Sequence, residues 1–224
     1  MDLSELNRDR VLLRWSRVHS NEKNIIQHDE KSLARLCGFL AGDGSVKIRT
    51  ESSGKIHHTM EFYPDDESLI EPFFQATEKI YGKRGKVERY QNHFRIRYYS
   101  KTIVEDILKI ATFGIYDWDI PGFIGKKKPL MREWLRAFFD AEAYVGKSHI
   151  KVQSVNGIGL KKVATMLEEF GIIPRFYTYE PKRSNWSKVY ILIINKKSDR
   201  TMFLNRIGFN HIKKQQLLRS IVKI

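Results

Sequence analysis

The chain has 224 residues, of which 42% are apolar, and this is enough for one large folded domain or two small ones. Lys and Arg outnumber Asp and Glu by 40 to 26, and the formal charge of +14 favours a polyanionic partner, with nucleic acid first. One cysteine excludes an internal disulfide, and no apolar run approaches the ~20 residues that would span a membrane. The first residues lack the features of a signal peptide, so we expect an intracellular protein of the cytoplasm or nucleoid.

The chain begins with a stretch, residues 1–29, in which apolar and arginine residues are interspersed. This pattern predicts an added helical arm. The arm contacts DNA or packs on the rest of the chain, and the sequence leaves both possibilities open.

Two similar stretches follow, LCGFLAGDG at residues 36–44 and LRAFFDAEA at residues 135–143, and each carries an acid near its end, Asp43 and Glu142. After each stretch the chain repeats the same succession of patterns, strand-like, helical, strand-like and helical. The repeat predicts two αββαββα units, at residues 30–122 and 123–224.

The elements expected after each stretch can be placed by their apolar spacing and turn residues. In the first unit they are a hairpin at 45–62, a helix at 67–81, a second hairpin at 85–99 and a helix at 102–112. In the second unit they are strand-like residues at 144–155, a helix at 160–170, a hairpin at 174–195 and a helix at 200–207.

Positive charge is concentrated on the predicted strands. Residues 83–101 contain seven basic residues and one acid, whereas the helical segment 65–79 is mainly acidic. A two-stranded ribbon fits the DNA major groove, where Arg and Lys bind guanine edges and phosphates, although an ordinary solvated sheet could also carry this charge. The candidate DNA-binding residues are Lys47, Arg49, Arg84, Lys86, Arg89, Gln91, Asn92, Arg95, Arg97, Lys147, Lys151, Gln153, Arg175, Tyr177, Tyr179, Lys182, Arg183, Asn185 and Lys188.

Within each repeated stretch, small residues recur four positions apart, Gly38 with Gly42 and Ala137 with Ala141. Each pair shares one helix face, so the two helices are expected to pack closely against each other and bring the two acids together where they end. Like charges repel there, and a divalent cation held by oxygen ligands, with magnesium preferred, would relieve the repulsion. Metal shared between carboxylates and phosphate suits phosphodiester hydrolysis. The alternative is a pair of ordinary surface carboxylates at helix ends.

Both stretches resemble the LAGLIDADG motif of homing endonucleases. Leu36, Gly38, Asp43 and Gly44 match the first copy, and Leu135, Asp140, Ala141 and Glu142 match the second. Among the departures, Ala143 stands where the motif ends in glycine, which suggests a weaker second site.

The resemblance implies an α+β fold in which two pseudo-symmetric units place their antiparallel sheets as a saddle over DNA, with the motif helices packed between them. It implies a monomer, with no obligate protein partner, that cuts both strands of a long asymmetric target and leaves 3′ overhangs. The metal would be held by Asp43 and Glu142 with main-chain Gly42 and Ala141. Mg²⁺ is the expected metal, Mn²⁺ should substitute, and Ca²⁺ should support binding without cleavage.

The resemblance also implies a basic side chain near each scissile phosphate. The candidates for this role are Lys126, Lys127, Lys128, Lys213 and Lys214. The alternative function on the same scaffold is a non-cutting DNA-binding regulator or an RNA-binding intron-splicing maturase.

Overall fold

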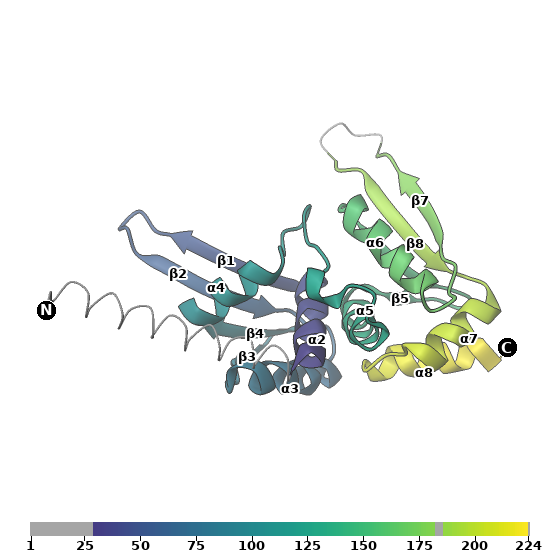
Figure 1. Ribbon diagram of the computed structural model, residues 1–224, viewed down its shortest axis with the longest axis horizontal. Helices are drawn as coiled ribbons and strands as arrows, with labels where there is room; N and C mark the ends of the chain where they lie inside the picture. The colour runs from purple at the N-terminus through teal and green to yellow at the C-terminus, as the bar shows by residue number, and fades with distance from the viewer. Residues whose placement is uncertain (1–28, 182–185, 224) are drawn as a thin grey trace, which may run out of the picture.

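The computed structural model describes residues 29–181 and 186–223, so all but the last residue of the predicted arm at 1–29 and the candidates Lys182, Arg183 and Asn185 lie outside the described residues. The described chain is an α+β protein made of two units, each with one four-stranded antiparallel sheet (Figure 1). The fold class predicted from the sequence is therefore confirmed.

The first unit follows the predicted order of elements closely. It comprises α2 (Glu30–Ala41), β1 (Gly44–Thr50), β2 (Ile56–Phe62), the short 3-10 helix η1 (Glu67–Leu69), α3 (Ile70–Tyr81), β3 (Lys86–Arg89), β4 (Phe94–Tyr99) and α4 (Lys101–Ile110). Caps set two of the starts, because the Asp66 side chain accepts from the amide of Ser68 and the Ser100 side chain accepts from the amide of Ile103.

The second unit repeats this order and adds a helix that the sequence analysis did not predict. It comprises the 3-10 helix η2 (Gly122–Ile124), α5 (Lys128–Glu142), β5 (Tyr144–Val145), β6 (Ile150–Ser154), α6 (Gly157–Glu168), β7 (Arg175–Tyr179), β8 (Val189–Ile194), α7 (Lys197–Arg206) and the additional α8 (Ile212–Lys223). Among the described residues, no helix is both long and apolar enough to cross a membrane.

The two sheets have the same topology, β1-β2-β4-β3 in the first unit and β5-β6-β8-β7 in the second. In the first sheet β4 lies between β2 and β3, and in the second sheet β8 lies between β6 and β7, so β4 and β8 occupy equivalent positions. The sheets diverge from the centre of the molecule, where α2 and α5 lie side by side (Figure 1).

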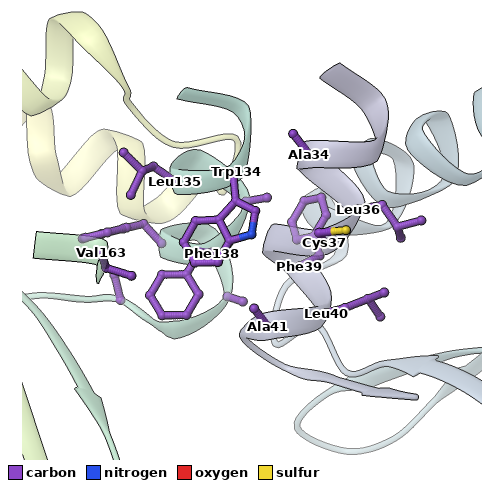
Figure 2. Close-up of a cluster of buried hydrophobic side chains, with 14 of the residues drawn as sticks. Ala34, Leu36, Cys37, Phe39, Leu40, Ala41, Trp134, Leu135, Phe138 and Val163 are labelled. Atoms are coloured by element: carbon purple, nitrogen blue, oxygen red, sulfur yellow. The ribbon is translucent and has the colours of Figure 1, made fainter. Parts of the chain in front are cut away.

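Small residues allow α2 and α5 to approach closely, as the sequence predicted. A Cβ atom built on Gly38 would lie 3.0 Å from the Cβ of Ala137, and one built on Gly42 would lie 2.6 Å from the Cβ of Ala141. The large apolar residues of the motifs point away from this contact, and Figure 2 shows Leu36 directed into the first unit. The two helices begin at the same end of the interface, because Arg35 of α2 pairs with Glu133 of α5 at 2.7 Å.

Aromatic side chains form the centre of the core in both units. In the first unit, Phe62 of β2 stacks on Phe73 of α3 with ring centroids 4.7 Å apart. In the second unit, Trp134 stacks on Phe138 at 4.9 Å within α5. All four side chains are almost fully buried, so the motif helices are fixed from both sides and their ends are held in place.

The substitution Gly38→Ala should destabilise the protein by about 1–3 kcal/mol, as overpacking of a tight contact does. The added methyl would overlap the carbonyl oxygen of Trp134, a backbone atom that cannot turn away. Urea unfolding would measure the loss. Gly122→Ala is the matched control, because a Cβ there meets nothing within 4 Å, and its free energy of unfolding should change by less than about 0.5 kcal/mol. Equal stability of the two variants would contradict the close packing of α2 and α5.

Candidate metal centre and nucleic-acid interface

The structure brings Asp43 and Glu142 together at the seam between the units. Glu142 is the last residue of α5, and Asp43 lies directly after Gly42, the residue that caps α2. A Cβ built on Gly42 would lie 3.3 Å from the Cγ of Glu142, so the backbone of one motif touches the acidic side chain of the other. The small residues at the interface thus determine how close the two carboxylates come.

The backbone conformation after the motif helix differs between the two units. Gly44 begins β1 against the backbone of Leu40, and any Cβ there would overlap the Leu40 Cα. Ala143 instead has φ −80° and ψ 137°, an extended conformation that alanine adopts readily. The departure from glycine at position 143 therefore imposes no backbone strain on the second motif.

The carboxylates of the seam are partly buried, and this desolvation affects their ionisation. The pKa of Asp43 is raised to about 6 and the pKa of Glu142 to about 7; burial is the largest cause in both, and the charge of Asp43 contributes to the rise at Glu142. Lys214 acts in the opposite direction and lowers both values. The seam therefore contains a cationic side chain within electrostatic range of both acids.

Lys214 reaches the seam from α8, the helix that the sequence analysis did not predict. Its Nζ donates to the carbonyl oxygen of Asp140 at 2.6 Å and to that of Ala141 at 3.0 Å, at the carboxyl end of α5. Burial lowers the pKa of its ammonium, while Asp65, Asp140, Asp43 and Glu142 act to raise it. Lys214 thus neutralises part of the negative charge where the two motif helices end.

A network of polar contacts fixes the start of α8. The buried Oδ1 of Asp140 accepts the amides of Asn210 at 2.8 Å and His211 at 2.9 Å. From the first unit, Asp65 lies 3.4 Å from the His211 imidazole, and Asp66 pairs with Lys213 at 2.8 Å. The C-terminal helix is therefore held by both units, and Lys214 is positioned as part of that network.

Three of the lysines expected near the acids lie elsewhere. Lys126, Lys127 and Lys128 precede or begin α5, and Lys127 pairs with Glu30 at 2.9 Å at the start of α2. A helix of this length places them about 20 Å from Glu142, so they do not approach the two carboxylates, and a role near the scissile phosphates stays a prediction. Lys213 is exposed and paired with Asp66, which leaves Lys214 as the predicted lysine that reaches the seam.

The face of the first sheet that is not covered by helices is polar. Strand register places Lys47, Thr59 and Tyr99 in one row across this face, and Glu61 beside Arg97. Arg97 pairs with Glu61, and Arg95 pairs with Glu88. Arg49 and Lys86 share this face, and Gln91 and Asn92 lie in the turn between β3 and β4.

Two predicted DNA-facing arginines of the first unit are placed differently. Arg84 pairs with Glu71 and Glu78 of α3, and its guanidinium lies over the ring of Phe74. Arg89 is opposite Phe94 in the ladder, and alternation along β3 puts it on the other face from Lys86. Both positions belong to the helical side of the sheet, which the charge count along the sequence did not distinguish.

In the second sheet, register places Lys151 and Gln153 of β6 on the uncovered face together with Arg175, Tyr177 and Tyr179 of β7. Lys147 is exposed between β5 and β6, and Lys188 pairs with Glu180 at 2.7 Å beside the start of β8. A hollow on this face is lined by Gln153, Tyr179 and Ile191 and also by Gly42 and Glu142, so the face continues into the seam.

Residues 129–208 match the family described as a LAGLIDADG-like domain. The solved structure of I-DmoI in complex with DNA and Mn superposes with a TM-score of 0.60 at 16% identity, covering 80% of this chain and 96% of that chain. The chain has the two-unit LAGLIDADG fold. Full-length WhiA from "Thermatoga maritima" has the same fold, with a TM-score of 0.55 at 16% identity, covering 87% of this chain and 60% of that one. The family resemblance predicted from the two motifs is thereby confirmed.

Curated relatives match this chain over most of its length. A replication factor C small subunit of Methanocaldococcus jannaschii is 31% identical over 86% of this chain. A glutamine-fructose-6-phosphate aminotransferase of the same organism is 20% identical over 97% of this chain. This chain spans only 10% and 20% of the length of these two relatives.

The seam between the LAGLIDADG motifs suits a divalent cation. Desolvation raises the pKa of each acid, the charge of Asp43 adds to the rise at Glu142, and Lys214 offsets only part of it. Within the described ranges, no three His, Cys, Asp or Glu side chains are grouped so as to hold a metal ion. Main-chain oxygens and substrate phosphates would therefore have to complete the coordination, as magnesium sites commonly allow.

The pH dependence of stability should reveal this seam. Asp43 and Glu142 have pKa values of about 6 and about 7 in the folded protein, above the ~3.9 and ~4.3 of unfolded chains. The folded state thus binds more protons, and in EDTA the melting temperature should fall as the pH rises from 5 to 8. Asp140, with a pKa raised to about 6, acts in the same direction.

Added Mg²⁺ should restore stability more strongly at pH 8 than at pH 5, because metal and protons compete for the same oxygens. Thermal melts over this pH range, with and without Mg²⁺, would measure both effects. The Asp43→Asn, Glu142→Gln double variant is the control. Its melting temperature should fall less with pH in EDTA, and Mg²⁺ should stabilise it less than the wild type. A wild-type melting temperature that rises with pH in EDTA would contradict the assignment of raised pKa values.

Proposed function

We propose that the chain is a divalent-metal-dependent endonuclease that cuts both strands of a long, asymmetric DNA target and leaves 3′ overhangs. The observation that carries the proposal is the pair of partly buried carboxylates, Asp43 and Glu142, at the adjoining ends of α2 and α5. The carbonyl oxygens of Gly42 and Ala141 are the proposed main-chain ligands. A bound cation would supply charge for the developing oxyanions and lower the pKa of a water, as it does in other phosphodiester hydrolases.

Different residues of the chain would bind the metal, neutralise charge and bind DNA. Asp43 and Glu142 hold the cation and keep it at the seam, and Lys214 neutralises part of their charge. The uncovered sheet faces, with Lys47, Arg97 and their neighbours, would bind the DNA on either side of the seam. The two units are joined in one chain, so a monomer would present both halves of the binding surface.

The matches to other proteins support a homing role. One chain of this length matches a tenth of a replication factor subunit and a fifth of an aminotransferase, two proteins with unrelated names. A segment that recurs in unrelated proteins behaves as a module that moves between genes. Cleavage of DNA at a long target is an activity that would promote such movement. I-DmoI, whose structure is similar to that of this chain, is a homing endonuclease.

A second candidate is a protein that binds DNA or RNA on this scaffold without cutting it. The observation that favours it is the Lys214 ammonium on the carbonyl oxygen of Ala141, one of the proposed metal ligands. A lysine that remained there would leave less room for a cation at that carbonyl. Incubation with DNA duplexes in Mg²⁺ separates this candidate from the endonuclease, because only the endonuclease would produce cut ends.

The test is incubation of the protein with a library of long randomised duplexes in Mg²⁺, followed by recovery and sequencing of cut ends. Parallel reactions contain Ca²⁺ or the Glu142→Gln variant. Discrete ends with 3′ overhangs, present only with Mg²⁺ or Mn²⁺ and intact Glu142, are expected. Tight binding with no cut ends under any metal would favour the non-cutting candidate.

A further inference from the structure

The two uncovered sheet faces differ in chemistry at equivalent positions. In the second sheet, β8 directs Val189, Ile191 and Ile193 onto this face, because the alternate residues Leu192 and Ile194 are fully buried in the core. The equivalent strand of the first sheet, β4, directs Arg95, Arg97 and Tyr99 onto its own uncovered face. The centre of one face is therefore aliphatic, and the centre of the other carries arginines paired with carboxylates.

The neighbouring strands add hydrogen-bonding side chains around the aliphatic centre. Ile191 lies between Gln153 of β6 and Tyr177 of β7, and Ile193 lies between Lys151 and Arg175. The aliphatic centre is thus bordered by two cations and by side chains that can bind base edges. This border has the charge that a DNA backbone requires, and it does not resemble the uncharged centre of a protein interface.

The aliphatic residues are connected to the acids. The hollow that contains Val189 and Ile191 is also lined by Gly42 and Glu142. On the first sheet, a separate hollow is lined by polar residues, Lys47, Arg49, Thr59 and Arg97 among them. A duplex lying across the seam would therefore place one half of its bases over an aliphatic surface and the other half over a surface of charged side chains of both signs.

The major-groove edges of the four bases respond differently to these surfaces. Thymine alone presents a methyl group, which binds aliphatic side chains, whereas guanine presents two acceptors that match an arginine. Arg95 and Arg97 are held by Glu88 and Glu61, and an acid on such a face accepts from the amino group of cytosine. The first face thus suits G·C pairs, and the second suits A·T pairs.

We propose that the second unit selects a thymine-rich half-site through contacts of Val189, Ile191 and Ile193 with thymine methyl groups, while the first unit selects a half-site richer in guanine. The inference rests on the proposed DNA binding but not on cleavage. The expected ligand is double-stranded B-form DNA, because its major groove exposes the methyl groups of successive thymines.

The experiment begins with selection of bound duplexes from a randomised library in Ca²⁺, and dissociation constants are then measured for modified versions of the selected target. Deoxyuridine replaces thymidine in one half-site at a time, which removes only the methyl groups. Binding should weaken about fourfold for each contacted methyl in the second unit's half-site, and should not change for the other half-site. 7-Deazaguanine in the first unit's half-site should weaken binding about tenfold or more, because an arginine loses an acceptor.

Two variants identify which half-site faces which unit. Ile191→Ser removes the aliphatic group and should reduce the difference in affinity between thymidine and deoxyuridine in one half-site only. Ile48→Ser is the matched control, an exposed strand position of the first unit whose register partner is His58, and it should leave both differences unchanged. Circular dichroism of both variants checks that they are folded.

The outcomes separate the inference from the proposed function. Binding that responds to deoxyuridine equally in both half-sites, or in neither, would overturn the inference and leave DNA binding standing. The same holds if Ile191→Ser has no effect on the response. Preference for RNA or single-stranded DNA over the selected duplex, or no retention of DNA at all, would overturn both.

Discussion

Replacing Asp43 with Asn, or Glu142 with Gln, is expected to abolish cleavage of both DNA strands while DNA binding stays intact or becomes tighter. Each substitution keeps the size of the side chain and removes the charge that would hold a cation beside the reacting phosphate. Loss of several kcal/mol of charge stabilisation slows cleavage by roughly a thousandfold or more. Affinity should not fall, because a carboxylate at the seam repels the phosphates of bound DNA. Single-turnover cleavage in Mg²⁺ and binding in Ca²⁺ would measure the two effects.

The same variants should also be more stable than the wild type in EDTA at pH 8. Burial and mutual repulsion raise the pKa of Glu142, so removal of either charge relieves a cost that the folded protein bears at that pH. Glu168→Gln is the matched control, since Glu168 is exposed on α6, and it should change neither cleavage nor stability. If both Asp43→Asn and Glu142→Gln cleaved DNA at the rate of the wild type, Asp43 and Glu142 would be excluded from the catalytic centre.

The parts of the fold that follow from local patterns could be predicted from the sequence. The two motifs combine an apolar helix, small residues four apart and a terminal acid, and each feature has a direct physical reading. The close contacts at Gly38 and Gly42 agree with that reading. Strand alternation predicted the hairpins, although it did not distinguish the two faces at Arg89, because the register with β4 is a property of the folded sheet.

The parts that depend on long-range packing could not be predicted. Helix α8 follows Gly208, which has φ 67° and ends α7, and its buried residues Leu218 and Ile221 are spaced for a helix. That signal is short, and two lysines at the start of a helix are unfavourable by the helix dipole alone. Only the packed structure, in which Asp140 accepts the amides of Asn210 and His211, explains why the helix begins there.

Removal of the Lys214 ammonium should move the pH dependence of the seam upward. Lys214 lowers the pKa of both Asp43 and Glu142, so Lys214→Met raises both values and makes the acids harder to ionise. The pH midpoint of Mn²⁺-induced stabilisation should therefore rise, and a shift of one unit corresponds to about tenfold weaker metal binding below the midpoint. Cleavage at pH 7 should fall by about a hundredfold, because a preorganised charge beside the phosphates is lost. Thermal melts in Mn²⁺ across pH 5–9, with single-turnover cleavage, would measure these effects.

The pH midpoint distinguishes electrostatic positioning from a merely structural role. Lys214→Met also leaves the carbonyl oxygens of Asp140 and Ala141 without a donor, which costs stability at every pH, but that loss alone does not move the midpoint. Lys214→Arg keeps the charge and should keep the midpoint near that of the wild type. Lys213→Met is the matched control, because Lys213 is the adjacent, exposed lysine paired with Asp66. An unchanged midpoint in Lys214→Met would mean that Lys214 only anchors α8, and the acids would then depend on the bound cation alone.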